Sequence, residues 1–225
     1  MRTATSTLSL HADHLPSPRL VLGSTSPYRR ELLARLGMRF DVASPDVDER
    51  PLLDEAPLQT ALRLAAWKAR AVARRCEDDA VVIGSDQVAD LNGMALGKPG
   101  DHARAKAQLQ AMRGQTVRFH TAVCVKRVST GFEQSQVSTV SVRFRTLSDD
   151  AIETYLRHEQ PYDCAGSAKC EGLGIVLLER IDSDDPTALV GLPLIVTTSL
   201  LQGAGLDVLS LLGKAGQTDL PDPTT

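Results

Sequence analysis

The feature that most constrains the fold lies in residues 20–33, where an apolar run passes through small residues directly into a helix start. Residues 20–22 predict a buried strand and residues 23–26 a tight turn, with Ser26 as the helix N-cap. Pro27 is favoured as the first helical residue because its missing N–H costs nothing there. The pattern predicts unpaired backbone N–H groups at the positive end of a helix dipole, which is the geometry of an anion site.

Two arginines, Arg29 and Arg30, follow in the first turn of this helix, where the dipole favours acids instead. The mismatch indicates a compensating negative ligand, and phosphate fits best. An ordinary strand–turn–helix with two solvated arginines remains the alternative at this point.

Composition excludes several classes of protein. A formal net charge of -3 and a pI near 6.0 argue against a general nucleic-acid partner, which usually requires a basic excess. No apolar run approaches the roughly 20 residues that span a bilayer, so no membrane partner is expected. The four cysteines have no paired CxxC spacing, which predicts reduced thiols in a cytoplasmic protein rather than a zinc site.

The order of patterns predicts an α/β protein with an elongated mixed sheet and flanking helices. We expect an N-terminal extension without order at 1–18, a single domain at 19–207 and a loose tail at 208–225. The expected helices are 27–36, 57–75, 101–112, 148–158 and 192–200, and the expected strands are 38–43, 80–84, 116–128, 132–144 and 173–178, with a hairpin at 88–96.

Carboxylates follow two of these strands. The loop 44–51 is bracketed by prolines and contains Asp48 and Glu49, and Asp86 follows the apolar run 80–84. Ligands of open α/β sheets bind beyond the carboxyl ends of strands, so these side chains are candidates for holding a metal or activating water. A solvated acidic turn and a capping aspartate are the alternatives.

Two lysines complete the candidate set. Lys68 lies at the edge of the apolar stripe of the helix 57–75, where a lysine can bury its stem and present its ammonium to a cleft. Lys98 stands between Gly97 and Pro99 after the hairpin. Hydrolysis of a phosphoanhydride needs cations for phosphate oxygens and carboxylates for a metal and a water, and the oxygen ligands favour Mg²⁺ or Mn²⁺.

The motifs at these positions resemble the Maf family of nucleoside triphosphate pyrophosphatases over about residues 19–207. The matching segments are 23–30, 48–49, 68–69, 84–87, 97–99, 164–167, 171–174 and 191–193. The resemblance implies two lobes around a central cleft, a divalent metal, usually a homodimer, and cleavage of a nucleoside triphosphate between the α and β phosphates.

The resemblance also implies roles for individual residues. Asp86 resembles the proton acceptor that activates water, and Glu49 resembles its metal-binding companion. The residues that resemble phosphate contacts are Ser24, Arg29, Lys68 and Lys98, with Ser26 beside them at the helix cap.

Within the family, Tyr28, Gln87 and Glu171 resemble the branch that hydrolyses 7-methyl-GTP. N7 methylation makes guanine cationic, and an aromatic ring stacks favourably on a cation. Tyr28 stands where Trp is expected in this branch. Glu171 can accept the paired N–H donors of the guanine edge. The alternatives are a dTTP/UTP pyrophosphatase of the same family and a non-catalytic nucleotide-binding regulator of cell division. Trp67 is predicted to lie in a subunit contact.

Overall fold

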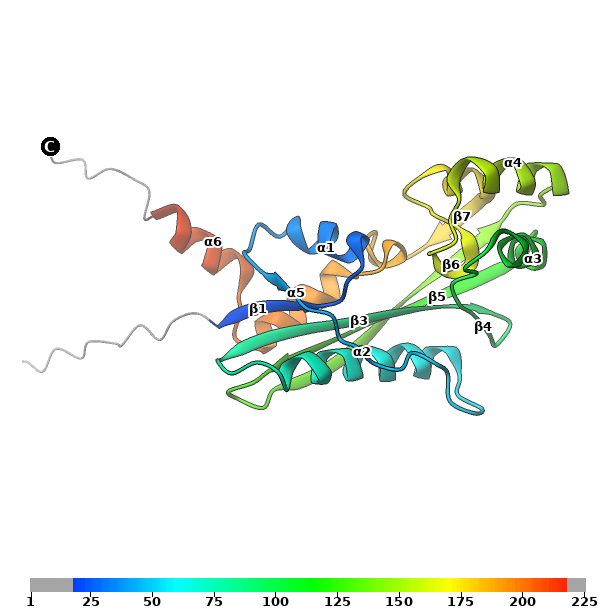
Figure 1. Ribbon diagram of the computed structural model, residues 1–225. Coiled ribbons are helices and arrows are strands. Elements are labelled where there is room, and N and C mark those ends of the chain that lie inside the picture. Colours follow the sequence, from blue (N-terminus) through cyan, green and yellow to red (C-terminus); the bar gives the residue numbers. More distant parts are fainter. Residues whose placement is uncertain (1–17, 218–225) are drawn as a thin grey trace, which may run out of the picture.

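The computed structural model describes residues 18–217, with side chains described to residue 213. The fold is the mixed α/β class expected from the sequence, built on one seven-stranded sheet (Figure 1). Its strands run in the order β2-β1-β3-β5-β6-β7, with β4 paired to β3. Their bounds are β1 Arg19–Gly23, β2 Asp41–Val42, β3 Ala80–Leu91, β4 Met94–Leu96, β5 Thr116–Arg127, β6 Glu133–Phe144 and β7 Leu178–Asp182.

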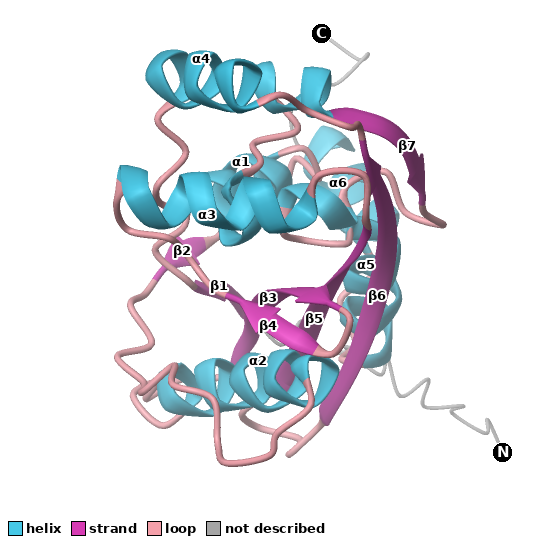
Figure 2. Ribbon diagram, turned by 90° about the vertical axis from the view of Figure 1, so that its right-hand side faces the viewer, coloured by secondary structure: helices cyan, strands magenta, loops and turns pink. Residues whose placement is uncertain are grey.

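Helices cover both faces of this sheet (Figure 2). Helix α2 packs on one face, and α1, α3, α4 and α5 pack on the other, where they form two separate core clusters. The bounds are α1 Pro27–Ala34, α2 Pro57–Ala73, α3 His102–Met112, α4 Asp149–Glu159, α5 Leu194–Gly203 and α6 Val208–Gln217, with short 3₁₀ segments η1 Ala165–Ser167, η2 Leu173–Leu177 and η3 Ala188–Val190.

Strand β3 differs from the prediction in a way that matters for the site. The sequence predicted a strand at 80–84 and a separate hairpin at 88–96, whereas β3 continues without a break to Leu91 and Asp86 lies inside it. The strand continues because β5 pairs with it through Asp90. Its parallel partner β1 stops at Gly23, opposite Gly84. Asp86 therefore lies just past the carboxyl end of the neighbouring strand, although it does not follow the end of its own.

Three further expectations are wrong in detail. Of the strand expected at 38–43, only Asp41–Val42 pairs with β1. The strand expected at 173–178 is the 3₁₀ segment η2, because the N–H groups of Gly172 and Gly174 both bond to the carbonyl of Lys169 and tighten the chain. The segment 208–217, expected to be a loose tail, forms helix α6. The expectations for residues 1–17 and 218–225 concern parts of the chain outside the described residues.

Trp67 lies on the outer face of α2 and is 38% exposed, with the Arg63 guanidinium 4.7 Å from its ring centroid. Its assignment to a subunit contact stays a prediction. Between residues 18 and 217, no helix combines the length and apolar character that crossing a membrane requires.

Helix α2 reaches the sheet closely only because residue 84 has no side chain. A Cβ at Gly84 would lie 2.2 Å from the carbonyl oxygen of Ala65 and 2.5 Å from the backbone nitrogen of Ala69. Backbone atoms of a packed helix cannot yield to a methyl group as a side chain can. Gly84 thus sets the distance between α2, which bears Lys68, and β3, which bears Asp86.

We expect Gly84→Ala to lower the free energy of unfolding by about 2–4 kcal/mol, because the methyl group must push α2 away from β3. Chemical denaturation with a linear extrapolation measures this loss. Gly97→Ala is the matched control, since nothing lies within 4 Å of its added Cβ. Equal stability of Gly84→Ala and wild type would contradict the packing argument.

Candidate active site

A pocket of about 790 Å³ opens where β1 ends, between α1, α2, the loop after β2 and the loop that contains η1. This volume lies within the usual range for ligand sites. All ten candidate residues from the sequence line it, although they come from six separate segments of the chain: Ser24, Ser26, Tyr28, Arg29, Glu49, Lys68, Asp86, Gln87, Lys98 and Glu171.

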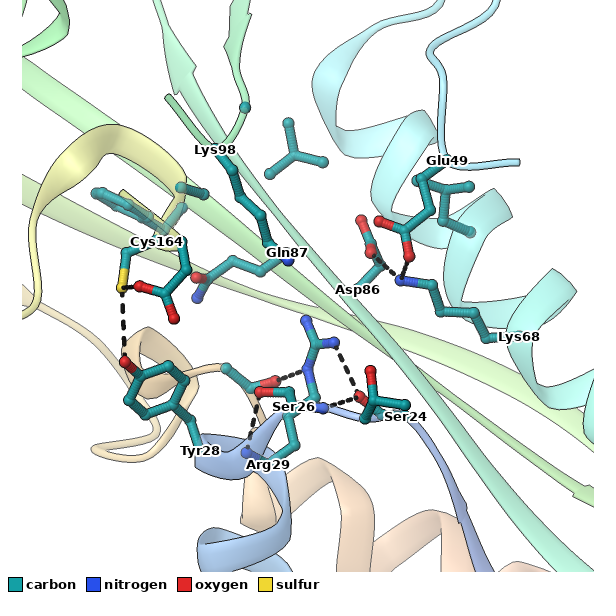
Figure 3. A pocket seen from close by; sticks show the side chains of 18 of the residues that line it. Ser24, Ser26, Tyr28, Arg29, Glu49, Lys68, Asp86, Gln87, Lys98 and Cys164 are labelled. Atoms are coloured by element: carbon teal, nitrogen blue, oxygen red, sulfur yellow. Dashed lines mark hydrogen bonds and ion pairs between the residues drawn. The ribbon is translucent and has the colours of Figure 1, made fainter. Parts of the chain in front are cut away.

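Lys68 joins the two candidate carboxylates (Figure 3). Its Nζ lies 2.7 Å from Asp86 Oδ1 and 2.7 Å from Glu49 Oε1, and the lysine side chain is only 5% exposed. Burial raises the pKa of Glu49, but the hydrogen bond from Lys68 and the charges of Lys98 and Arg29 outweigh it, so the pKa is lowered overall. Glu49 is therefore ionised at neutral pH.

Arg29 and the turn before α1 lie where the sequence predicts an anion site, and its role stays a prediction. Ser26 caps the helix by accepting from the backbone N–H of Arg29 at 3.4 Å. The Arg29 guanidinium donates to the Gly191 carbonyl at 2.9 Å and to Ser24 Oγ at 3.4 Å, which points it into the pocket. Burial lowers the pKa of Arg29, and the charges of Asp86 and Glu49 oppose that change. Lys98 extends into the pocket from the opposite side (Figure 3).

The other end of the pocket is built around the Tyr28 ring. The Cys164 thiol lies 3.9 Å from Tyr28 Oη and 3.5 Å from Asp163 Oδ1. Burial raises the pKa of Tyr28, and the neighbouring Cys164, Asp163 and Glu171 raise it further. Burial likewise raises the pKa of Cys164 to about 12, so both groups are neutral at pH 7. Among the side chains that line this end of the pocket, Asp163 and Glu171 supply the formal charge. The Lys169 ammonium, 5.7 Å from the centroid of the Tyr28 ring, pairs with Glu159.

Gln87 lines the pocket but is partly committed to the protein. Its amide nitrogen donates to Thr121 Oγ1 at 2.9 Å and to the carbonyls of Ala188 and Leu189 at 3.2 and 3.0 Å. These bonds hold the loop that presents the Gly191 carbonyl to Arg29. Within the described residues no hydrogen bond engages the Gln87 amide oxygen, so this atom is available to a ligand.

Sequence reasoning missed three contributors to the pocket. No role was assigned to Asp163 or Cys164 from the sequence, although Cys164 begins the segment 164–167 that resembles the family. The Gly191 carbonyl accepts from both Arg29 and Ser85 Oγ, at 2.9 and 3.1 Å. A backbone carbonyl is not encoded by residue type. The available signals were the resemblance of the segment 191–193 to the family and the positive φ that a glycine allows at position 191.

The carboxylate pair has the donor chemistry for a hard divalent cation. Asp86 and Glu49 each bond Lys68 through one oxygen, and within residues 18–217 no hydrogen bond or ion pair engages the second oxygen of either. The same residues contain no cluster of three or more His, Cys, Asp or Glu that could hold a metal by itself. Two carboxylates suit Mg²⁺, which usually takes its other ligands from water and substrate phosphates.

The lowered pKa of Glu49 predicts how the Lys68 contact responds to acid. Its contribution to stability is complete above the carboxyl pKa of the unfolded chain and is lost as pH falls through the lower pKa of the folded state. We expect the difference in unfolding free energy between wild type and Glu49→Gln to shrink between about pH 5 and about pH 3. Denaturant titrations at several pH values measure it, and a difference that stays constant would contradict the ion pair.

The chain is similar to known proteins over most of its length. A family model described as "Maf-like protein" matches residues 19–204. A 7-methyl-GTP pyrophosphatase of Polaromonas sp. (strain JS666 / ATCC BAA-500) is 66% identical over 195 residues, which cover 87% of this chain and 89% of that protein. A 7-methyl-GTP pyrophosphatase of Albidiferax ferrireducens is 64% identical over 85% of this chain and 96% of that protein.

Among solved structures, a nucleoside-triphosphatase / dITP/XTP pyrophosphatase from Mycobacterium abscessus is similar at 20% identity. The match covers 57% of this chain and 75% of that chain, and its TM-score of 0.36 is too low to support a conclusion about this protein. The family match and the identities of the curated relatives do support one. This chain belongs to the family of Maf-like proteins.

Proposed function

We propose that this chain hydrolyses 7-methyl-GTP to 7-methyl-GMP and diphosphate. The observation that carries the proposal is the separation of charge along the pocket. Arg29 and Lys98 supply cations near the carboxylate pair, whereas Asp163 and Glu171 supply anions near the Tyr28 ring. A nucleotide with an anionic triphosphate and a cationic base has the complementary polarity. The two relatives described above are both named for this substrate.

The base end favours a methylated guanine over a neutral base. A cation over a tyrosine face gains about 0.5–2 kcal/mol, depending on how far it is desolvated. Glu171 lines the same pocket as Tyr28, and its negative charge helps to raise the pKa of the Tyr28 hydroxyl. Its carboxylate supplies acceptors for the N–H donors of the guanine edge, as the sequence analysis anticipated.

The phosphate end contains the groups for attack at the α phosphorus. In the proposed step, the free oxygen of Asp86 accepts a proton from water while the water oxygen bonds to the α phosphorus. The bond from that phosphorus to the bridging oxygen breaks, and diphosphate leaves with the bonding pair. Lys68 holds Asp86 and Glu49 in place, and Arg29 and Lys98 neutralise the charge that develops on the phosphate oxygens.

We propose Mg²⁺ or Mn²⁺ as the cofactor, which Glu49 and Asp86 would hold; the Asp86 oxygen that accepts the proton is not the one that would contact the ion. Such an ion polarises phosphoryl oxygens and lowers the pKa of bound water. The hard oxygen donors of the pair support this choice over zinc, and the described part of the chain shows no His or Cys that joins the pair in a metal cluster.

We expect Asp86→Asn to lower kcat by about 10²–10⁴-fold, because an amide cannot accept the proton from water. Nucleotide affinity should change far less, since the phosphate cations remain. Asp90→Asn is the matched control: this buried carboxylate lies on the same strand and pairs with His120 and Arg118, away from the pocket. Steady-state kinetics and equilibrium binding measure the two variants, and an Asp86→Asn enzyme with full activity would overturn the proposed base.

Tyr28 variants test how the base is recognised. We expect Tyr28→Ala to reduce the preference in kcat/KM for 7-methyl-GTP over GTP by about 5–20-fold, because the cationic base loses its aromatic surface. Tyr28→Arg should reduce it further through repulsion of like charges, and Tyr28→Phe, which keeps the ring, should retain the preference. Unchanged turnover of 7-methyl-GTP by Tyr28→Arg would contradict the stacking argument.

A further inference from the structure

Glu159 is a nearly buried carboxylate that the proposed chemistry does not use. It is the last residue of α4, and its side chain is 14% exposed. Its Oε2 accepts the backbone N–H of Leu173 at 2.7 Å, and its Oε1 lies 3.2 Å from Lys169 Nζ. A carboxylate at the C-terminal end of a helix faces the negative end of the dipole, so it requires compensating donors such as these.

The segment 169–174 folds tightly around this carboxylate. A Cβ at Gly172 would lie 2.9 Å from Glu159 Oε2, so the backbone there lies directly against it. The N–H groups of Gly172 and Gly174 both donate to the Lys169 carbonyl at 3.0 Å. Glu171 stands in the middle of this turn and lines the pocket. The position of the Glu171 backbone therefore depends on contacts made outside the pocket.

Lys169 connects the same carboxylate to the base end of the site. Its Nζ lies 5.7 Å from the centroid of the Tyr28 ring while it pairs with Glu159. Its backbone N–H donates to the buried hydroxyl of Tyr155 at 3.1 Å, which fixes the residue to α4. Lys169 is not one of the side chains that line the pocket. Its ammonium is therefore close to the ring without lining the pocket that a ligand would occupy.

We propose that Glu159 and Lys169 are a pair of positioning residues that holds Tyr28 and the Glu171 loop in the arrangement that reads the base. The inference rests on the proposed function for the identity of the base, but the contacts themselves do not. The pair acts on recognition at one end of the pocket and leaves the proton transfer at Asp86 unaffected.

The test uses product inhibition, which separates the two ends of the pocket. Glu159→Gln keeps an acceptor for Leu173 N–H but loses the charge that pairs with Lys169, and Lys169→Gln removes the other partner. We expect inhibition by 7-methyl-GMP to weaken about tenfold in each variant, the size of one charge-assisted hydrogen bond, while inhibition by diphosphate and kcat stay within about twofold. The double variant should lose little more than either single variant, because the two residues act as one unit.

Glu153→Gln is the matched control on the same helix. Glu153 pairs with His102, Lys106 and Arg157, and none of these contacts reaches the segment 169–174. We expect it to change the thermal midpoint without changing either inhibition constant. Inhibition by 7-methyl-GMP that is unchanged in Glu159→Gln would overturn the proposal. So would an equal weakening of inhibition by both products, which is the result of a general loss of structure.

The substrate preference of the wild type, measured in the same series, distinguishes a failure of this inference from a failure of the proposed function. If the wild type prefers another triphosphate, the proposed substrate is wrong, and the same comparison is made with the monophosphate of the preferred nucleotide. Selective weakening of that inhibitor in both variants still supports the positioning pair, and no weakening overturns it.

Discussion

The contact on which the rest of this structure depends is the buried ammonium of Lys68 shared between Asp86 and Glu49. A charged group removed from water costs several kcal/mol unless partners compensate it, so the lysine requires both carboxylates close by. These three residues come from α2, from the middle of β3 and from the loop after β2. Their contact holds α2, β3 and the loop after β2 together at one point.

The geometry of the sheet makes this contact possible. Strand β1 stops at Gly23, opposite Gly84, while β3 continues, which opens a space beside Asp86 at the carboxyl end of the parallel pair. The bare backbone at Gly84 lets α2 approach closely enough for Lys68 to reach that space. The N-terminus of α1 closes the same space from another side and directs Arg29 toward it. The carboxylate pair, Lys68 and Arg29 therefore meet at one point of the sheet, where β1 ends beside β3.

The other end of the pocket, around Tyr28 and Glu171, depends in part on a different set of contacts. Helix α4 supports the turn 169–174 through Glu159 and Tyr155, and the turn in part supports Tyr28. Tyr28 shares helix α1 with Arg29, whereas the turn that bears Glu171 rests on α4.

Much of the fold and of the lining of the pocket could be predicted from the sequence, where local patterns determine the structure. The helix cap at Ser26 and the helix start at Pro27 could be predicted because capping chemistry is local. Helical periodicity predicted that Lys68 lies at the edge of the apolar stripe of its helix. The continuation of β3 through Asp86 was not readable, because pairing with β5 across the sheet decides it. The 3₁₀ turn at 173–177 and the Gly191 carbonyl were missed for a related reason: each depends on backbone hydrogen bonds that residue types do not encode.

Hydrolysis of 7-methyl-GTP in ¹⁸O-labelled water, with Mg²⁺ or Mn²⁺ present, tests the central claim most directly. Mass spectrometry of the two products reports which phosphorus the water attacks. The account predicts diphosphate without label and one ¹⁸O atom in 7-methyl-GMP, because the water that Asp86 activates bonds to the α phosphorus. Label in the diphosphate, release of single phosphate, or no turnover by folded protein would contradict it.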